Sequence, residues 1–314
     1  MVVLGIDIGS AQIRAGMVDE SGAILASRAA ATPHDLDSLL SFLHDAIDWL
    51  SEAAGQPAGA GVGSKGIVNP ENTRVEKLRG TLHYLEGLCL SEVVGLPSDV
   101  PVFADNDARA AMAGEMVWGA ARGRQDALLL MLGNGVGGAA LVEGRLLRGH
   151  SGVAGHLGHY TVEVDGAVCA CGNRGCLETV FSARAIEAEA WAAVHRGCAS
   201  SLTRLFREQP QLASCRTVFQ AASEGDEVSQ AIVAKAIHKL AAAIAGLLHI
   251  FDPEVVILGG QVTDAGEVLL EPLREDVWAR TRGLLGREVP LLEQGVADRS
   301  GIVGAAALAM GSRD

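Results

Sequence analysis

The sequence predicts an α/β protein built from two related halves. Two stretches, VVLGIDIGSAQIRAGMVDESGAILAS near the N-terminus and DALLLMLGNGVGGAALVEGRLLRG from residue 126, share one pattern of three apolar strands. A polar glycine-containing turn joins the first two strands in each stretch, and an acid-glycine turn joins the next two. Predicted helices and buried strands follow each stretch. With 314 residues, the chain is long enough for two domains or for one large α/β unit around a cleft.

The first half continues with a helix and a junction between a strand and a helix. GAGVGSKGIVNPENTRV reads as a strand broken by glycines, with a turn at Asn69 and Pro70. The strand in PVFADNDARAAMAGEM stops at Asp105 and becomes an alanine-rich helix, which puts Asn106 and Asp107 at the junction. Polar side chains at this end of a strand often face a ligand. The earlier helix is indicated by apolar residues at helical spacing, namely Leu36, Leu39, Leu40, Leu43, Ile47 and Leu50.

The second half is expected to contain helices over residues 186–194 and 228–251, a buried strand in DPEVVILGG and a final helix over residues 302–310. Residues 228–251 are the most apolar long stretch, but basic side chains at its middle favour a buried helix over a membrane span. No linker separates the parts of the chain. The domain boundary is therefore expected to be a hinge near residues 118–124.

Composition and charge restrict the class of protein. Hydrophobic residues make up 49% of the chain and charged residues 20%, which argues against intrinsic disorder. The 38 acidic and 25 basic side chains give a net charge of −13, which is unfavourable for binding nucleic acid. The N-terminus lacks the pattern of a secretory signal, so we expect a cytoplasmic protein.

Three cysteines are packed into the segment CACGNRGC, at Cys169, Cys171 and Cys176. In a reducing cytoplasm such a cluster is more typical of a metal site than of disulfides. With His159 upstream, three thiolates and one imidazole suit tetrahedral Zn²⁺ in a closed structural site. The alternative is three free thiols in a loop.

The run LLMLGNGVGGAALVEGRLLRGHSGVAGHLGH, followed by CACGNRGCLE, resembles the ROK family (repressors, open reading frames and sugar kinases) of the actin-like ATPase superfamily. DIGSAQIRAGMVD, FADNDARAA and VVILGG extend the resemblance over nearly the whole chain, in the family order. It implies two actin-like ATPase (RNase H-like) domains flanking a cleft, with a zinc-binding loop formed by the histidine and three cysteines named above. The smaller domain would comprise residues 1–118 and the C-terminal helix 302–314, and the larger domain residues 119–301.

The resemblance implies a glucokinase-like ATP:hexose phosphotransferase, dependent on ATP and Mg²⁺, that phosphorylates the primary (6-) hydroxyl of a hexose such as glucose or of a hexose derivative. Phosphoryl transfer to a hydroxyl needs a base near the attacking oxygen. The family pattern makes Asp107 that base and gives Asn106 to the sugar hydroxyls. Asp105 is the rival, although successive strand side chains point to opposite faces. Asp107 as a plain helix N-terminal charge is the other alternative.

The resemblance also implies further sugar ligands. ROK sugar kinases carry a GExGH element, which reads GHLGH here, so that His159 is kept and His156 replaces the glutamate. Glu178 belongs to the CLE element, and Gly66 to the glycine-rich loop beside the sugar, where Lys65 stands at a normally uncharged position. An imidazole in place of a carboxylate changes which hydroxyl, amine or acetamido group is accepted. Harmless drift is the alternative at His156, and projection into solvent is the alternative at Lys65.

On the nucleotide side, Asp7 matches the acid that orients Mg²⁺ and its water shell, while an ordinary hairpin turn is the alternative. The usual DxGGTK pattern is DIGSAQ here, so a threonine hydroxyl that contacts phosphate is missing. In the second turn Asn134 stands where threonine is common, and glycine N–H groups can still cradle oxygens. The residues assigned to nucleotide are Asp7, Gly9, Ser10, Gln12, Gly133, Asn134, Gly135, Gly137, Gly259 and Gly260.

Other functions stay open. ROK repressors add an N-terminal helix-turn-helix, for which the first strand, beginning at Val2, is expected to leave no room. A sugar-binding protein with weak or no kinase activity is one alternative, and an N-acetylhexosamine, amino-sugar or cyclitol kinase is another. The expected partners are a sugar and ATP, without nucleic acid or membrane, and the resemblance suggests a homodimer.

Overall fold

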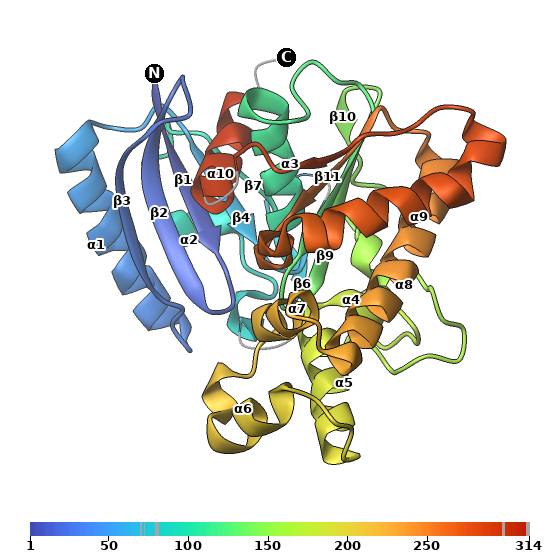
Figure 1. Cartoon of the computed structure of the whole chain (residues 1–314). Coiled ribbons are helices and arrows are strands. Elements are labelled where there is room, and N and C mark those ends of the chain that lie inside the picture. Colours follow the sequence, from blue (N-terminus) through green and yellow to red (C-terminus); the bar gives the residue numbers. More distant parts are fainter. Residues whose placement is uncertain (70, 72, 79–81, 297–298, 312–314) are drawn as a thin grey trace. The chain divides into compact units, whose positions relative to one another are not determined.

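Two five-stranded sheets form the framework of the computed structural model, which describes residues 1–69, 71, 73–78, 82–296 and 299–311 (Figure 1). In the first sheet, β1 pairs antiparallel with β2 and parallel with β4. β2 and β3 are antiparallel, and β4 and β7 are parallel. Across this sheet the order is β3 (Ile24–Ala31), β2 (Gln12–Asp19), β1 (Val2–Ile8), β4 (Ala60–Ser64) and β7 (Val102–Asn106).

The second sheet repeats this order of strands. When the five strands of each sheet are numbered along the chain, both sheets have the spatial order third, second, first, fourth, fifth. In the second sheet β11 is parallel to both β8 and β12. The shared topology confirms the expectation of two related halves. The order is β10 (Arg145–Leu146), β9 (Val136–Val142), β8 (Ala127–Leu132), β11 (Val255–Gly259) and β12 (Leu291–Glu293).

A separate hairpin joins β5 (Ile67–Val68) and β6 (Val75–Lys77). The predicted turn at Asn69 and Pro70 falls within this hairpin, and Pro70 lies outside the described residues. In the second three-strand stretch, the acid-glycine turn is confirmed at Glu143 and Gly144, where φ is 51° and 74°. Positive φ at both central residues is typical of the type I′ turn that matches the twist of a hairpin.

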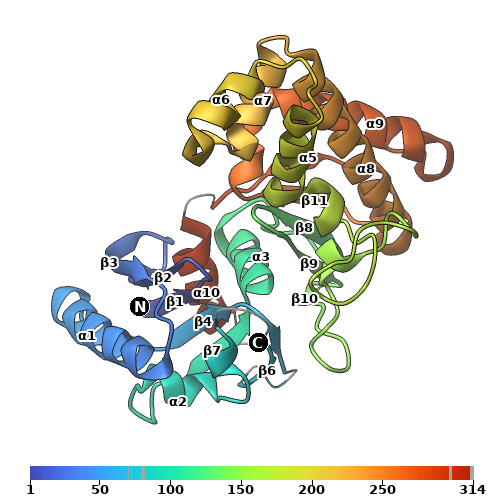
Figure 2. The ribbon, with the colours of Figure 1, turned by 90° about the horizontal axis from the view of Figure 1, so that it is seen from below.

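Helices cover the sheets, and most of the predicted ones are confirmed. Around the first sheet, α1 and α2 share one apolar core with β1, β2 and β4, and α10 packs against α3 (Figure 2). The α6, α7 and α9 helices lie where the sequence analysis specified no element. The helices are α1 (Leu36–Ala54), α2 (Leu90–Val94), α3 (Asp107–Trp118), α4 (Glu178–Phe181), α5 (Ala183–His195), α6 (Leu202–Glu208), α7 (Cys215–Ser223), α8 (Glu227–Phe251), α9 (Glu267–Leu285) and α10 (Ser300–Met310).

The packing divides the chain into two compact units. Unit 1 contains residues 1–125, 139–155 and 294–314, and unit 2 contains residues 126–138 and 156–293. Residues 139–155 thus group with unit 1, whereas the expected boundaries assign them to the larger domain. Those boundaries, like the expected hinge, stay a prediction. The last residues of the expected C-terminal helix, 312–314, lie outside the described part of the chain.

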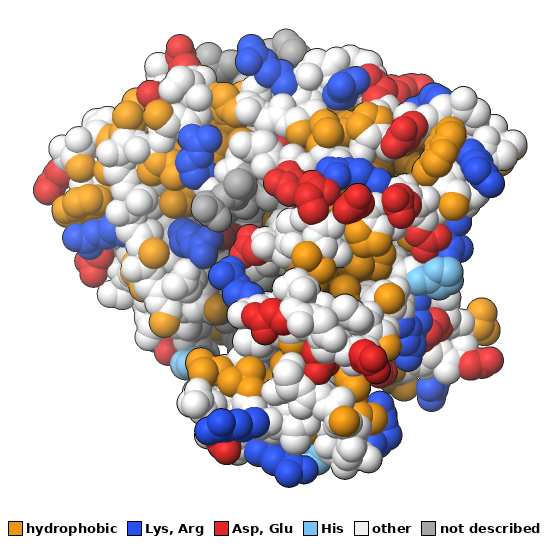
Figure 3. Space-filling model, in the orientation of Figure 1, with side chains coloured by type: hydrophobic (Ala, Val, Ile, Leu, Met, Phe, Trp, Pro, Cys, Tyr) orange, Lys and Arg blue, Asp and Glu red, His pale blue; other side chains and the backbone are white. Residues whose placement is uncertain are grey.

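Among the described helices, only α8 is long and apolar enough to cross a membrane by length and composition. In the most apolar 18-residue window, 56% of the residues are buried within the protein. α8 packs against α5, α7 and α9, so its apolar face has protein partners. These contacts agree with the expectation of a buried helix. Acidic side chains lie over α9 on the face shown in Figure 3. Glu271 and Glu275 of this helix are exposed.

Candidate functional site

The junction between β7 and α3 lies where the sequence predicts it, and it joins two of the predicted sugar ligands. β7 ends at Asn106, which caps α3 by accepting a hydrogen bond from the backbone N–H of Ala108 at 3.0 Å. The side-chain amide of Asn106 donates to the carbonyl oxygen of Gly66 at 3.0 Å. Asp107 is the first residue of the helix, and its Oδ1 also accepts from Ala108 N–H, at 2.9 Å.

Asp105, the rival candidate for the base, is buried in the interior of unit 1. Its Oδ1 accepts from the backbone N–H of Asn106 at 2.8 Å and from Nε of Arg109. Its Oδ2 accepts from Nε of Arg148 at 3.0 Å. The side chain is 1% exposed, so both oxygens are enclosed by protein donors. This carboxylate therefore serves as the anion of a buried ion-pair network, and its surroundings do not suit contact with a substrate.

Asp7 lies near the end of β1 and is close to Asp107. Partial burial and the negative charge of Asp107 raise the pKa of Asp7, Arg14 and Lys65 act to lower it, and the net result is a pKa of about 6. The nearest of these cations is Arg14, with Nη1 3.9 Å from Oδ2 of Asp7. Two carboxylates that destabilise each other's charge are typical of a site that receives a cation, and oxygen ligands suit Mg²⁺.

The turn after β1 is closed by its own backbone. The N–H of Gly9 donates to the carbonyl oxygen of Gln12 at 3.1 Å, and the carbonyl oxygen of Gly9 accepts from the Thr32 hydroxyl at 2.6 Å. The side chains of Ser10 and Gln12 are exposed, and Oε1 of Gln12 accepts from Nη2 of Arg14 at 3.0 Å. The departures from the family pattern therefore change the exposed surface of the turn, while its backbone remains hydrogen-bonded.

In unit 2 the structure brings together two motifs that the sequence analysis treated separately. The turn after β8 contains Gly133, whose N–H donates to the carbonyl oxygen of Gly135 at 3.0 Å. The exposed Asn134 accepts a hydrogen bond from Nε2 of Gln261 at 3.0 Å. Gln261 directly follows Gly260 in the chain. Gln261 was not predicted as a site residue, and its only signal in the sequence is its position next to the glycine pair.

Glu178 lies between this turn and the cysteine cluster. Its Oε2 accepts from the backbone N–H of Val136 at 2.9 Å, and its Oε1 lies 3.8 Å from Sγ of Cys169. A Cβ atom at residue 135 would overlap the Glu178 carboxylate, so a larger residue in place of Gly135 would displace this carboxylate. The predicted sugar ligand thus already has a backbone partner on the glycine turn, which its sequence motif alone does not reveal.

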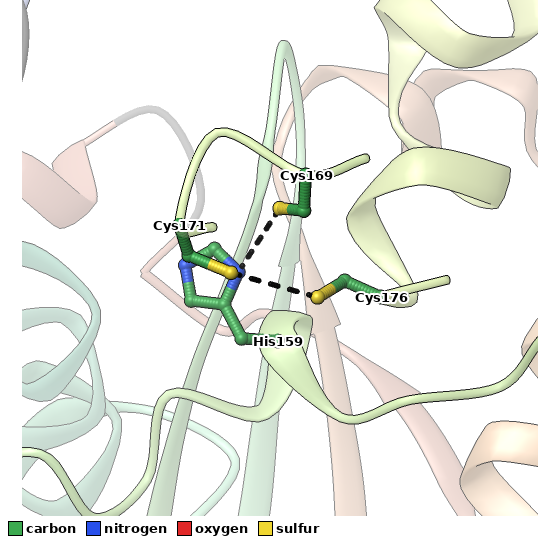
Figure 4. Close-up of side chains that lie close together, drawn as sticks. All are labelled: His159, Cys169, Cys171 and Cys176. Atoms are coloured by element: carbon green, nitrogen blue, oxygen red, sulfur yellow. Dashed lines mark hydrogen bonds between the residues drawn. The ribbon is translucent and has the colours of Figure 1, made fainter. Parts of the chain in front are cut away.

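The four predicted metal ligands converge (Figure 4). One nitrogen of His159 and the three cysteine sulfurs all lie within 4.8 Å of one another. Sγ of Cys171 is 3.7 Å from Sγ of Cys176, and Nδ1 of His159 is 3.6 Å from Sγ of Cys169. Tetrahedral zinc, with bonds of about 2.0 to 2.3 Å, separates its ligand atoms by about 3.3 to 3.8 Å. The donor set and these two distances therefore fit zinc.

His156, which stands where the family usually has a glutamate, lies beside this cluster. Its ring centroid is 6.5 Å from that of His159, and the two rings are nearly parallel, with an angle of 12° between their planes. Both side chains are half-buried; His156 directly precedes the short 3₁₀ turn over Leu157–His159, and His159 is its last residue. The replacement therefore places a second imidazole next to a candidate metal ligand.

Comparisons with known proteins agree with this arrangement. The model of the ROK family matches residues 3–312. Glucokinase from Thermotoga maritima is 33% identical over 98% of this chain and 96% of its own length. N-acetylmannosamine kinase from Citrobacter koseri is 32% identical, with both chains covered completely. The crystal structure of a ROK family glucokinase from Streptomyces griseus, in complex with glucose and AMPPNP, matches with a TM-score of 0.85 at 31% identity. That match covers 99% of this chain and 100% of the other. By sequence and by fold, this chain belongs to the ROK family.

Proposed function

We propose that this protein is an ATP-dependent sugar kinase that phosphorylates the primary hydroxyl of a hexose or of a hexose derivative. Its similarity to two kinds of sugar kinase, over the full length of the chain, supports the reaction class. The observation that carries the proposal is the junction of β7 and α3. There the side-chain amide of Asn106 donates a hydrogen bond to Gly66, and Asp107 lies near the half-buried Asp7.

In the proposed reaction, Asp107 accepts the proton of the hexose hydroxyl as its oxygen forms a bond to the γ-phosphorus of ATP. The bond from that phosphorus to the bridging oxygen breaks, and ADP leaves. Asn106 orients the sugar through its side chain. Each unit has a glycine turn, around Gly9 in unit 1 and around Gly135 in unit 2, whose backbone N–H groups would donate hydrogen bonds to phosphate oxygens.

Two metal ions belong to the proposal. Asp7 would hold Mg²⁺ through its water shell, and the ion would neutralise phosphate charge when bound. His159 and the three cysteines would hold structural Zn²⁺, supported by their N and S donor set and the spacing of the four atoms. The protein would work in the cytoplasm, where thiols stay reduced and ATP is present, and we propose a homodimer by family resemblance.

The direct test is a panel of sugars assayed for ATP consumption with the zinc-loaded protein. We expect turnover with at least one hexose and formation of its 6-phosphate, identified by NMR of the product. Lack of turnover with every sugar, together with no binding of ATP and Mg²⁺ in calorimetry, would support a sugar-binding protein without kinase activity.

An N-acetylhexosamine kinase is a second candidate, favoured by His156. An imidazole there offers a donor or a neutral acceptor in place of a carboxylate, which changes the preferred sugar substituent. In the same panel, a higher kcat/KM for N-acetylmannosamine than for glucose would favour this candidate. His156→Glu should then shift the preference toward glucose, while the reverse order in the wild-type protein would exclude it.

A further inference from the structure

A buried ion-pair network lies beneath the junction that carries Asn106 and Asp107. Arg109, the third residue of α3, is 1% exposed and donates through Nε to Asp105. Its Nη1 donates to the carbonyl oxygens of Gly152 and Ala154, at 3.1 and 3.0 Å. Arg148 completes the network with its Nη2 2.9 Å from Oδ2 of Asp105. All of these residues belong to unit 1.

A buried ion-pair network adds little net free energy to the stability of a protein. A buried ion pair is often no more stabilising than apolar residues of similar volume, because both charges lose their hydration. Nη2 of Arg109 is also buried and has no hydrogen-bond partner among the described residues, and an unsatisfied buried donor costs about 1 to 3 kcal/mol. A contribution to stability therefore does not explain this network well. Its effect on the positions of the segments that it connects explains it better.

The network connects two segments that are far apart in the sequence. Asp105 holds the backbone of Asn106 at the end of β7, and the Arg109 side chain holds the segment 148–154 through two of its carbonyl groups. That segment is closed on itself by a hydrogen bond from Ala154 N–H to the carbonyl oxygen of Arg148 at 3.2 Å. Two residues after Ala154 the chain reaches His156. One guanidinium thus braces both the junction and the chain leading to the histidine pair.

We propose that Asp105, Arg109 and Arg148 are positioning residues for sugar phosphorylation, an assignment that rests on the proposed function. They hold the Asn106–Asp107 junction and the segment 148–154 in one fixed arrangement. Because their bonds go to the backbone of Asn106, a predicted sugar ligand, and to the segment that leads to His156, another one, loss of the network lowers sugar affinity and turnover and leaves nucleotide affinity unchanged.

The test compares Arg109→Met, Arg109→Lys and a matched control, Glu115→Gln. Glu115 is also fully buried on α3, but its carboxylate accepts hydrogen bonds from Ala120, Gly295 and Val296 N–H at the other end of the helix. For each zinc-loaded protein we would measure Tm, kcat, KM for the sugar, and AMPPNP affinity with Mg²⁺. Hydrogen exchange of the peptide covering residues 148–155, in the protein without ligands, provides a readout independent of activity.

We expect Arg109→Met to accelerate exchange of residues 148–155, to lower kcat by about 100-fold, and to raise KM for the sugar. AMPPNP affinity should stay within about twofold of the wild-type value, because the hydrogen bonds described for Asp105, Arg109 and Arg148 go to segments other than the glycine turns. Arg109→Lys should recover part of kcat, because lysine keeps the charge facing Asp105 but loses the fork to two carbonyls. If Arg109→Met does not fold, Arg148→Met replaces it in the test, because the Arg148 side chain is 28% exposed and its loss disturbs the interior less.

Equal losses of kcat in Arg109→Met and Glu115→Gln at equal losses of Tm would overturn the positioning role and leave a structural one. Unchanged exchange of residues 148–155 in Arg109→Met would overturn it as well. If the wild-type protein phosphorylates no sugar, the proposed function fails and the assignment to phosphorylation fails with it. Accelerated exchange in Arg109→Met would then still show that the network braces the segment, so the two failures are distinguishable.

Discussion

Asp7 is a half-buried carboxylate whose charge its protein surroundings do not fully compensate. Burial and the nearby Asp107 raise its pKa to about 6, above the usual 3.8. A raised carboxyl pKa means that the native state binds this proton more tightly than the unfolded chain does. The contribution of Asp7 to stability is therefore fully present below pH 3.8 and is lost as the pH rises through about 6.

We therefore predict that Asp7→Asn is more stable than the wild-type protein at pH 7.5, by about 1 to 3 kcal/mol. The difference should shrink as the pH falls from 6 to 4, because the wild-type carboxyl becomes neutral there. Thermal unfolding of both proteins across this pH range measures the effect. A variant that is less stable than the wild type at pH 7.5, without added Mg²⁺, would contradict the account of Asp7.

The cysteine cluster gives a second prediction at the residue level. Cys176→Ser should lose most bound zinc and lower Tm by several degrees, since a ligand within 4.8 Å of the other three is removed. Cys215→Ser is the matched control, because Cys215 is buried on α7 and outside the cluster. Metal analysis by mass spectrometry and thermal unfolding measure both effects. Full zinc content in Cys176→Ser would exclude the proposed ligand set.

Contacts between residues that are close together in the sequence could be predicted, and contacts between distant residues could not. The candidate metal ligands could be singled out because three of them lie within eight residues, and their chemistry limits what such a cluster can do. The bond from Asp105 to Arg148 spans 43 residues, and the bond from Val136 to Glu178 spans 42. No local pattern indicates such pairs, because they arise only when the elements pack.

At the level of elements, Asp226 joins the start of α8 to the segment before α6. Its carboxylate accepts from Ser229 N–H at 2.8 Å, as the N-cap of α8, and from Ser201 N–H at 2.6 Å. Partial burial acts to raise the pKa of Asp226, but the hydrogen bonds from Ser201 and Ser229 outweigh it and lower the pKa to about 2. The stabilisation is present above pH 3.8 and is lost as the pH falls through about 2.

Asp226→Ala should therefore lower the free energy of unfolding by about 1 to 2 kcal/mol at pH 7, the range typical of a lost N-cap. The difference from the wild type should narrow below pH 3.8. Asp226→Asn keeps an acceptor oxygen for the cap and should lose less. Urea unfolding at pH 7 and at pH 3 tests the pair of variants. Equal stability of Asp226→Ala and the wild type at pH 7 would show that the cap contributes nothing.

Elements with a regular apolar pattern could be predicted, and the others could not. The apolar positions of α1 and the β7–α3 boundary were visible in the sequence and are confirmed. The α9 helix was not singled out, although Leu269, Leu273 and Val277 recur on its buried face at intervals of four residues. Pro272 inside the helix obscures that pattern, because proline is a helix breaker in sequence-based reasoning.

At the level of the whole molecule, the sequence predicts two related halves. This prediction follows from two similar stretches of sequence, and the order of the strands confirms it. The grouping of residues 139–155 with unit 1 could not be read from the sequence, because no change in composition marks the places where the chain passes between units. Hydrogen bonds from Arg109 to Gly152 and Ala154, which depend on packing, tie this segment to α3.

The central claim is that Asp107 acts as the base in ATP-dependent phosphorylation of a hexose. The measurement that tests it most directly is the kcat of Asp107→Asn beside the wild-type protein, on the best sugar of the panel, with zinc content and AMPPNP affinity as controls. We predict a loss of about 10² to 10⁴-fold in kcat, with zinc content and AMPPNP affinity retained. Turnover close to that of the wild-type protein would contradict the claim.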